Sequence, residues 1–289
     1  MDALEIKNLN KTFDGFNIKN INLSLSKGYI LGYIGQNGAG KTTTIKLIMN
    51  QIKKDSGEIR IFGKEYNDDE AGYKNMIGFI GDECYFPTCF TLKDVIATMK
   101  DFYISFNEDK FREYVERWQL PYKKKIKEFS KGMKVKLSFA SVLSRDTKLL
   151  LLDEPTSGLD PVIRSEILEI LQEYIADGER SVLFSTHITS DLEKITDYLF
   201  FINKGEKVFY DTTENILESH LLVKGGIEDL TEELREKLIG HKSSSYGFEG
   251  LISSKDKKYI NENLLLEKPS MDEIIVFYIS GMRRNWNNE

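Results

Sequence analysis

Hydrophobic residues follow two different spacings along the first two thirds of the chain. Residues 4–9 and 21–25 alternate between apolar and polar side chains, which predicts antiparallel strands with one buried face. Three short runs are almost wholly apolar and predict strands buried on both faces of a parallel sheet, at residues 29–34, 148–153 and 181–186. Helical spacing separates these runs, for example at residues 42–49 and 163–175. Strands that alternate with helices in this way predict an α/β fold built on a parallel sheet.

The pattern changes in two other parts of the chain. Between residues 83 and 144 the spacing is helical and poor in strands, which indicates a helical subdomain inserted between sheet strands. After Asp211 the segments become short and polar, with scattered glycine. We therefore expect one large domain over residues 1–211, with its helical subdomain at about 83–144, and a small C-terminal α+β domain over residues 212–289.

The C-terminal domain ends in a predicted amphipathic helix. Ser270 and Glu273 have the spacing of a capping box, and Pro269 precedes them. Six large side chains then recur on one face of the helix: Met271, Ile274, Ile275, Tyr278, Ile279 and Met282. Because an isolated helix this short is marginal in water, we expect the stripe to be buried. It packs either on its own small domain or against the large domain or a second subunit.

Composition and charge exclude several classes of protein. The chain has 289 residues, of which 40% are apolar, and a formal net charge of −6. That charge argues against nucleic-acid binding, which needs a clustered basic face. We expect no membrane span and no signal peptide, because no run approaches about 20 apolar residues and the N-terminus lacks an apolar core. Cys84 and Cys89 have no neighbouring metal ligands, and we expect them to be reduced thiols in a cytoplasmic protein. Any membrane part must then come from a separate chain.

A glycine-rich sequence at residues 35–42 fits the phosphate-loop pattern G-x-x-x-x-G-K-[ST]. It follows a predicted buried strand and opens a predicted helix, so its backbone N–H groups and the helix N-terminus can bind phosphate. Lys41 is expected to neutralise the β- and γ-phosphates, and the Thr42 hydroxyl to bind Mg²⁺. The predicted nucleotide-binding residues of this segment are Gly35, Asn37, Gly38, Ala39, Gly40, Lys41, Thr42 and Thr43.

Two carboxylates, Asp153 and Glu154, end the apolar run at 148–153. Open α/β sheets bind ligands at the carboxyl ends of their strands, which places the pair where the phosphate loop also lies. Asp153 is expected to hold Mg²⁺, through a bound water, and Glu154 to orient and polarise the attacking water. The alternative is a strand end whose acidic residues are only solvated.

Three more motifs follow in order: Phe-Ser-Lys-Gly-Met at 129–133, Ser-Gly-Leu-Asp at 157–160, and Thr186-His187. With the phosphate loop and the carboxylate pair, they make residues 1–210 resemble the nucleotide-binding subunits of the ABC (ATP-binding cassette) family. The resemblance implies a RecA-like P-loop NTPase core with an antiparallel β subdomain and an ATPase activity. It also implies two cassettes that face each other, with each ATP between the phosphate loop of one and the signature loop, residues 129–133, of the other.

The resemblance assigns roles to individual residues, and most of them have a structural alternative. Ser130 and the N–H of Gly132 are expected to meet the partner's γ-phosphate, although Ser130 also suits a plain helix cap. His187 is expected to contact the γ-phosphate and to join Glu154 and Lys41 in catalysis, unless it is a structural histidine. Asp160 is expected to cross the interface between the two cassettes, unless it belongs to a turn that only caps a helix. Phe13 is expected to stack on adenine, unless it is a core residue.

The sequence departs from the family pattern at three motif positions. Lys131 stands in place of a glycine and Met133 in place of a glutamine in the signature loop. Asp82 stands where the family has a glutamine, and we expect it to be a Mg²⁺ ligand rather than a solvent-facing carboxylate. The next residues, 84–90, are apolar for a loop. In the family this stretch docks the coupling helix of the membrane subunit; simple packing of the helical subdomain is the alternative.

Among P-loop proteins, a kinase or GTPase has no use for a signature loop. ABC proteins of ribosomes or DNA repair generally carry two cassettes or a coiled-coil insert, and neither is present. The remaining class is a transporter ATPase that uses ATP and Mg²⁺. The chain resembles the ATPases of Gram-positive exporters of antibiotics, bacteriocins and cytolytic peptides at residues 81–83, 129–133 and 266–274. Its expected partners are a second cassette, identical or not, and a membrane permease bound through residues 82–95 at the cytoplasmic face of the membrane.

Overall fold

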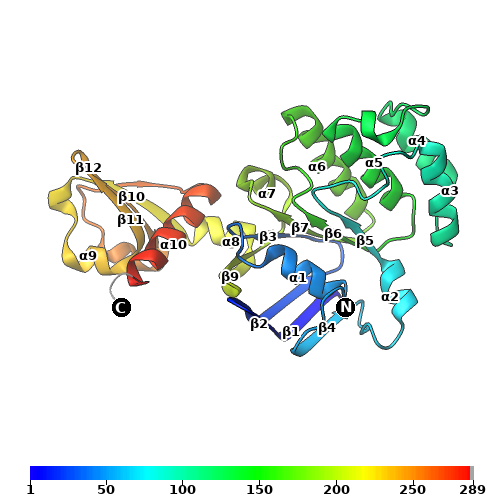
Figure 1. The fold of residues 1–289 in the computed structure, drawn as a ribbon. Coiled ribbons are helices and arrows are strands. Elements are labelled where there is room, and N and C mark those ends of the chain that lie inside the picture. The colour runs from blue at the N-terminus through cyan, green and yellow to red at the C-terminus, as the bar shows by residue number, and fades with distance from the viewer. Residues whose placement is uncertain (287–289) are drawn as a thin grey trace. The chain divides into compact units, whose positions relative to one another are not determined.

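The computed structural model describes residues 1–286, and side chains as far as Met282. The chain divides into two compact units, Met1–Tyr210 and a second unit that begins at Asp211 (Figure 1). The first unit contains two sheets and the second unit one, and each unit has its own apolar core.

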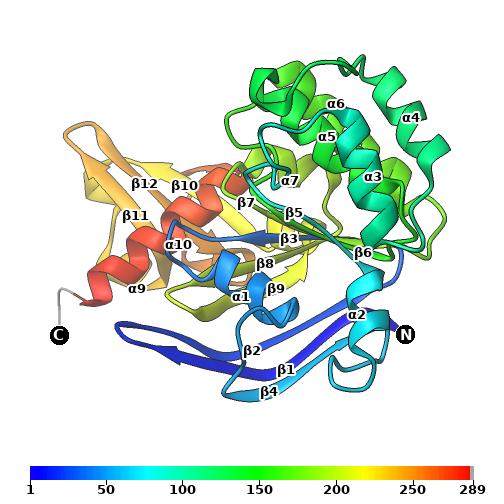
Figure 2. The ribbon, with the colours of Figure 1, turned by 45° about the vertical axis from the view of Figure 1, so that its right-hand side comes forward.

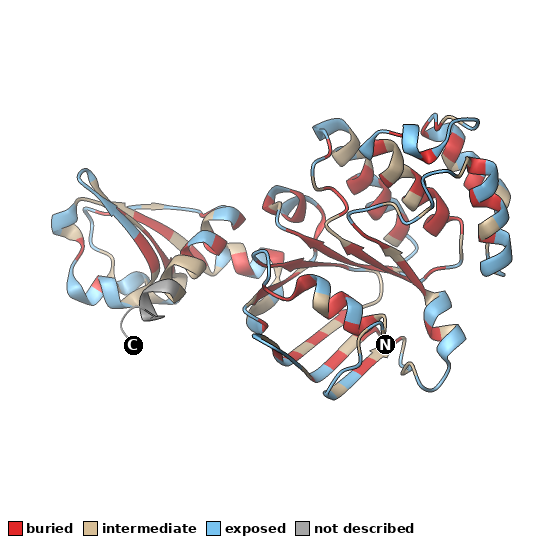
Figure 3. Ribbon diagram, in the orientation of Figure 1, coloured by how far each residue is buried: buried red, intermediate tan, exposed pale blue. Residues whose placement is uncertain are grey.

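A six-stranded sheet forms the centre of the N-terminal unit, with strand order β5-β6-β7-β3-β8-β9. Its strands are β3 (Ile30–Ile34), β5 (Ile77–Ile80), β6 (Leu149–Asp153), β7 (Ser181–Thr186), β8 (Tyr198–Asn203) and β9 (Glu206–Thr212). Neighbouring strands pair in parallel along the order β5-β6-β7-β3-β8, and the inner ones are buried on both faces (Figure 3). The predicted α/β fold on a parallel sheet is therefore confirmed.

A second, antiparallel sheet packs in the same unit, with order β2-β1-β4. It consists of β1 (Asp2–Phe13), β2 (Phe16–Ser26) and β4 (Ser56–Ile61). The helix α1 (Lys41–Ile48) lies between the two sheets (Figure 2). Ala3, Leu4, Ile6 and Leu9 of β1 join one apolar core with α1 and β3. A register shift between Ile6 and Leu9 interrupts the period-two pattern that the sequence predicted.

Helices cover the other face of the central sheet (Figures 1 and 2). They include α3 (Leu92–Phe102), α4 (Glu108–Arg117), the short 3₁₀ helix η1 (Ile126–Glu128), α5 (Lys131–Leu143), α6 (Pro161–Ile175) and α7 (Thr189–Ile195). A further helix, α2 (Glu70–Met76), precedes β5. Residues 83–144 contain helices and no strand, as their spacing predicted.

The C-terminal unit is an antiparallel sheet of order β11-β12-β10-β13 with short helices. Its strands are β10 (His220–Gly225), β11 (Leu238–Ser244), β12 (Gly247–Ser253) and β13 (Leu265–Glu267). Its helices are α8 (Thr213–Glu218), η2 (Ile227–Asp229), α9 (Glu232–Lys237), η3 (Ser254–Tyr259) and α10 (Met271–Trp286). This mixture confirms the predicted α+β character.

The last helix, α10, begins where its capping box predicted. The backbone N–H of Ser270 donates to Glu273 (2.7 Å), and the N–H of Glu273 donates to the Ser270 hydroxyl (3.3 Å). The helix packs directly on β11, because a Cβ on Gly240 would lie 2.1 Å from the carbonyl oxygen of Phe277. Met271 and Ile274 are buried in the unit. Of the two predicted alternatives, the structure shows packing on the helix's own domain.

Candidate nucleotide site

The phosphate loop joins β3 to α1 and has the backbone shape that its glycines predicted. Gly38 and Gly40 adopt φ values of +79° and +114°, which residues with a Cβ rarely adopt. The space next to Gly38 is open, whereas a Cβ on Gly40 would lie 2.7 Å from the Ile18 side chain. The loop is thus supported from beneath and open above, as a phosphate cradle requires.

Lys41 is buried at the first position of α1, with 6% of its side chain exposed. Its ammonium donates a hydrogen bond to the carbonyl of Gly35 (2.7 Å). It also lies 3.4 Å from Oε1 of Glu154. The positive charge that should meet phosphate is therefore already paired with the predicted catalytic carboxylate.

Asp153 ends β6 beside β7, and the parallel register sets it opposite Ser185. The Ser185 hydroxyl donates to its carboxylate (3.2 Å), and Thr42 of the phosphate loop lies close enough to the same carboxyl group to lower its pKa. Burial raises the pKa of Asp153, and the charge of Glu154 adds to the rise, while the two hydroxyl groups oppose it. The predicted contact between the strand end and the phosphate loop is present. Ser185 was not predicted, although a serine near the carboxyl end of an apolar strand was a usable signal.

Glu154 has a left-handed backbone, with φ of +55°. Its N–H donates to the carbonyl of Ser185 (2.9 Å), which holds this conformation. Its Oε2 lies 2.6 Å from Nδ1 of His187 and accepts the backbone N–H of the same residue (3.3 Å). A non-glycine residue with such a backbone is rare and occurs often at functional sites. Glu154 thus bridges Lys41 and His187, and the three predicted catalytic residues form one connected group.

A hollow of about 480 Å³ opens beside this group. Its lining includes the three predicted metal ligands, Thr42, Asp82 and Asp153, together with Glu154. These are the oxygen donors that Mg²⁺ prefers. In residues 1–286, no three or more His, Cys, Asp or Glu side chains are close enough to hold a metal by themselves. This fits Mg²⁺, which usually takes one or two carboxylates and completes its shell with substrate phosphates and water. Tyr85, which also lines the hollow, was predicted only as part of the stretch that binds the permease.

The signature loop and the following turn cap helices within this chain. Ser130 accepts the N–H of Met133 (3.2 Å) at the start of α5. Asp160 accepts the N–H groups of Val162 and Ile163 (both 3.1 Å) at the start of α6. Ser130 and Asp160 therefore do cap helices of their own chain. Gly132 is buried, and a Cβ there would lie 2.3 Å from the Ile163 side chain, so the two helix starts are packed together. The roles of Ser130, Gly132 and Asp160 toward a facing ATP stay predictions.

Phe13 ends β1 with 36% of its side chain exposed, so it is not a core residue. The ammonium of Lys11 lies 5.6 Å from the centre of its ring, and the ring of Phe16 lies 6.4 Å away. Phe16 in turn approaches the phosphate loop at Gly40. The exposed Phe13 ring, which is separated from the phosphate loop by Phe16, is available for stacking. Its contact with adenine stays a prediction.

The site combines a P-loop, a buried lysine, a hydroxyl group beside a carboxylate, and a glutamate that bridges Lys41 and His187. Together these features define an ATP-binding site. Comparison with known proteins identifies the class more closely. The family model described as "ABC transporter" matches residues 18–157. A lantibiotic transport ATP-binding protein, SrtF of Streptococcus pyogenes, is 34% identical over 74% of this chain and 94% of its own. The chain therefore belongs to the ATP-binding subunits of ABC transporters, and it is an ATPase.

Two other similarities agree with this family. The ABC transporter ATP-binding protein YtrB of Bacillus subtilis is 27% identical over 97% of this chain and 99% of its own. A solved ATP-binding subunit of an ABC transporter superposes with a TM-score of 0.67 and 27% identity, over 74% of this chain and 91% of that one. YtrB thus extends through the C-terminal unit as well. Within residues 1–286, no helix is long and apolar enough to cross a membrane.

Proposed function

We propose that this chain powers export of an antimicrobial, bacteriocin-like or cytolytic peptide, or of an antibiotic, through a separate membrane permease. The observation that carries the ATPase part is the position of Glu154, which is held between Lys41 and His187 beside Asp153. The similarity to a lantibiotic transport protein supports a peptide as cargo. In this proposal the chain acts at the cytoplasmic face of the membrane, bound to the permease.

The side chains have distinct roles in hydrolysis. Lys41 exchanges its contact with Glu154 for the phosphates, because a charged phosphate is the stronger partner. This exchange releases Glu154 to orient a water and accept its proton. The N–H and imidazole of His187 keep the carboxylate in place. Mg²⁺ would neutralise developing charge on the phosphates, and Thr42, Asp82 and Asp153 are the ligands that this chain offers.

A second cassette completes the site in this proposal. The N-terminus of α5, with Ser130 and Gly132, offers N–H groups and the positive end of a helix dipole to phosphate. Val162, at the start of α6, is 69% exposed beside Asp160, as suits a residue that a facing subunit covers. Two such chains, or this chain and a related one, then enclose each ATP.

The permease binds at a groove, which we define as the hollow of about 900 Å³ between α2, β5, α3 and α5. Three residues of the 82–95 segment line it, Tyr85, Phe86 and Pro87. At its rim, Tyr85 and Phe102 are 68% and 76% exposed. Large exposed apolar side chains around a hollow mark a surface that another protein covers.

The test is reconstitution of the full-length chain with the membrane protein that co-purifies with it. ATP-dependent movement of a fluorescent lantibiotic across vesicles of neutral and anionic phospholipid should exceed that of a Glu154→Gln preparation. Robust ATP turnover without peptide movement would rule out peptide cargo while leaving the ATPase assignment intact.

A further inference from the structure

The Phe13 ring lies at the tip of a two-stranded ribbon. The last pair between β1 and β4 joins Asn10 to Ser56. Beyond that point residues 11–13 of β1 pair with β2, and Phe13 faces Phe16 across the turn (Figure 2). A ribbon of two strands is marginally stable in water without a third strand or a packed face. A ring at such a tip needs a further support if it is to stay in one place for a ligand.

Asp55, the residue that precedes β4, bonds to three consecutive residues of this ribbon. Its N–H donates to the carbonyl of Asn10 (3.0 Å), and its Oδ2 accepts the N–H of Thr12 (2.7 Å). Its Oδ1 lies 2.6 Å from the ammonium of Lys11. The bond to Lys11 and then that to Thr12 lower the pKa of Asp55, so the carboxylate is ionised at neutral pH. Asp55 therefore takes the place of a third strand where the pairing with β4 has ended.

Lys11 connects this carboxylate to the ring. While its ammonium is bonded to Asp55, it also lies over the Phe13 ring, 5.6 Å from the centre. The Lys11 side chain is 19% exposed. A cation over one face of an aromatic ring is attracted to its π electrons. Lys11 therefore steadies the ring and occupies one of its faces, and a flat ligand must approach the other face.

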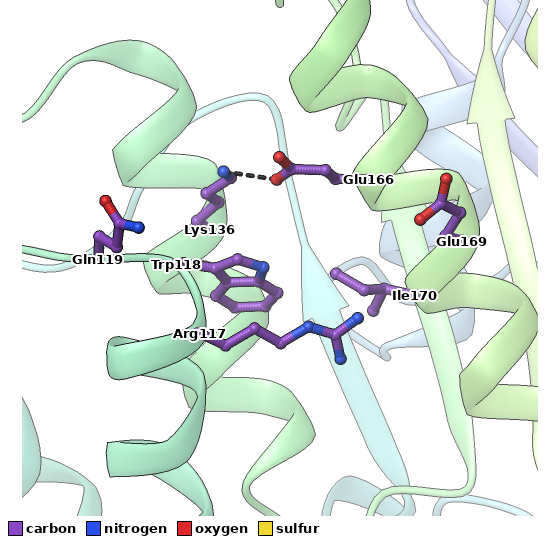
Figure 4. A pocket seen from close by; sticks show the side chains of 7 residues that line it. All are labelled: Arg117, Trp118, Gln119, Lys136, Glu166, Glu169 and Ile170. Carbon is purple, nitrogen blue, oxygen red and sulfur yellow. Dashed lines mark ion pairs between the residues drawn. The ribbon is translucent and has the colours of Figure 1, made fainter.

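Other ion pairs of the same unit join elements that are fixed in another way (Figure 4). Lys136 of α5 lies 2.5 Å from Glu166 of α6, beside a hollow of about 420 Å³. Arg117 of α4 lies 2.9 Å from Glu173 of α6. These pairs link helices whose inner faces are buried in the unit. Asp55 instead supports the exposed end of a ribbon, so its bonds have more influence on where the attached side chains lie.

We propose that Asp55 and Lys11 form a clamp that sets the Phe13 ring for stacking on adenine, and that Asp55 is a positioning residue for nucleotide binding. The inference rests on the proposed function, with adenine stacked on Phe13, and it adds the groups that hold the ring in place. A ring that is fixed before binding loses little freedom when the base arrives, so more of the stacking energy appears as affinity.

The clamp also relates the ring to the phosphate loop. The Phe16 ring lies 6.4 Å from that of Phe13. A Cβ on Gly40 of the loop would lie 3.1 Å from the Phe16 ring. A ligand that contacts both the loop and Phe13 must carry a flat group at a fixed distance from its phosphates, as a nucleotide does. The clamp therefore acts on the base end of the nucleotide and leaves the phosphate end unchanged.

The first experiment separates these two ends by isothermal titration calorimetry of the full-length chain with Mg·ATP and with Mg·tripolyphosphate, which has no base. Asp55→Ala should bind ATP about 5-fold more weakly, because a charge-assisted hydrogen bond no longer fixes the ribbon. Its affinity for tripolyphosphate should equal that of the wild type. Lys11→Met should show the same pattern.

Asp69→Ala is the matched control for this experiment. Asp69 likewise accepts a backbone N–H, from Gly72 (2.8 Å), and an ammonium, from Lys64 (3.2 Å), but it does so at the start of α2. Its affinities for ATP and for tripolyphosphate should both match the wild type.

The second experiment asks whether Asp55 acts through the ring. Phe13→Leu should weaken ATP binding by about 10-fold, because a base loses its stacking partner. Adding Asp55→Ala to Phe13→Leu should have little further effect, since no ring remains to be positioned. In turnover assays Asp55→Ala should raise KM for ATP and leave kcat unchanged.

Three results would overturn the clamp: an unchanged ATP affinity in Asp55→Ala, an equal loss of affinity for ATP and tripolyphosphate, or full additivity of the two substitutions. The second of these is what a purely structural role of Asp55 would give. Normal ATP affinity in Phe13→Leu would exclude adenine stacking and the clamp with it. A wild-type chain without ATP turnover would instead count against the proposed function, since the binding measurements do not depend on turnover.

Discussion

Nδ1 of His187 lies 2.6 Å from Oε2 of Glu154, while the other oxygen of that carboxylate lies 3.4 Å from the ammonium of Lys41. Glu154 is therefore held from both sides before any nucleotide arrives. Its left-handed backbone follows directly after β6, whose parallel partner β7 leads to His187. The arrangement lets ATP binding free the carboxylate by taking Lys41 away from it.

Glu154→Gln should stop hydrolysis while ATP still binds. The amide keeps the shape of the side chain but cannot accept a proton, so turnover should fall by about 10²- to 10⁴-fold. Bound ATP should persist and keep two chains together, which phosphate release and the apparent mass with ATP would show. Glu179→Gln, at an exposed loop, is the matched control. Near-normal turnover in Glu154→Gln would remove this residue from the role of base.

Lys41→Ala should weaken ATP binding by about 30-fold or more, because a desolvated contact between lysine and phosphate is lost. Titration with a fluorescent nucleotide measures this change. In the same variant Glu154 loses its counter-charge, so the double variant Lys41→Ala/Glu154→Gln should unfold at a higher temperature than Lys41→Ala alone. Unchanged nucleotide affinity would mean that Lys41 serves only as the counter-charge of Glu154.

Asp82→Ala should raise the Mg²⁺ concentration needed for half-maximal hydrolysis, because one oxygen donor leaves the hollow that Thr42 and Asp153 line. It should also reduce the stimulation of turnover by the membrane partner, since the residue adjoins the segment that lines the groove. Glu83→Ala is the neighbouring control. If both the Mg²⁺ dependence and the stimulation match the wild type, Asp82 is a solvent-facing carboxylate.

Asp153→Asn should stabilise the nucleotide-free protein while abolishing Mg²⁺-dependent turnover. Burial raises the pKa of Asp153 above its value in the unfolded chain, so its ionisation favours unfolding. Stability is then lost as pH rises from the unfolded pKa, about 3.9, through the higher folded value. The asparagine removes that loss, so the difference in unfolding temperature should be absent at low pH and present at pH 7. Equal unfolding temperatures at both pH values would contradict this account.

Much of this protein was determined by local sequence. The phosphate loop needs glycines where φ is positive, and helix starts need a capping side chain, so residues 35–42, Ser130 and Ser270 could be read directly. Apolar runs buried on both faces likewise predicted β3, β6 and β7. For the C-terminal unit the sequence predicted the α+β class but not the individual strands, because short polar segments with glycine show little periodicity.

Tertiary structure decided which groups meet. Ser185 reaches Asp153, and His187 reaches Glu154, only because β6 and β7 pair in parallel with one particular register. Backbone conformation follows from adjacent residues, whereas electrostatic partners are separated by tens of residues and are fixed only when the sheet and helices pack.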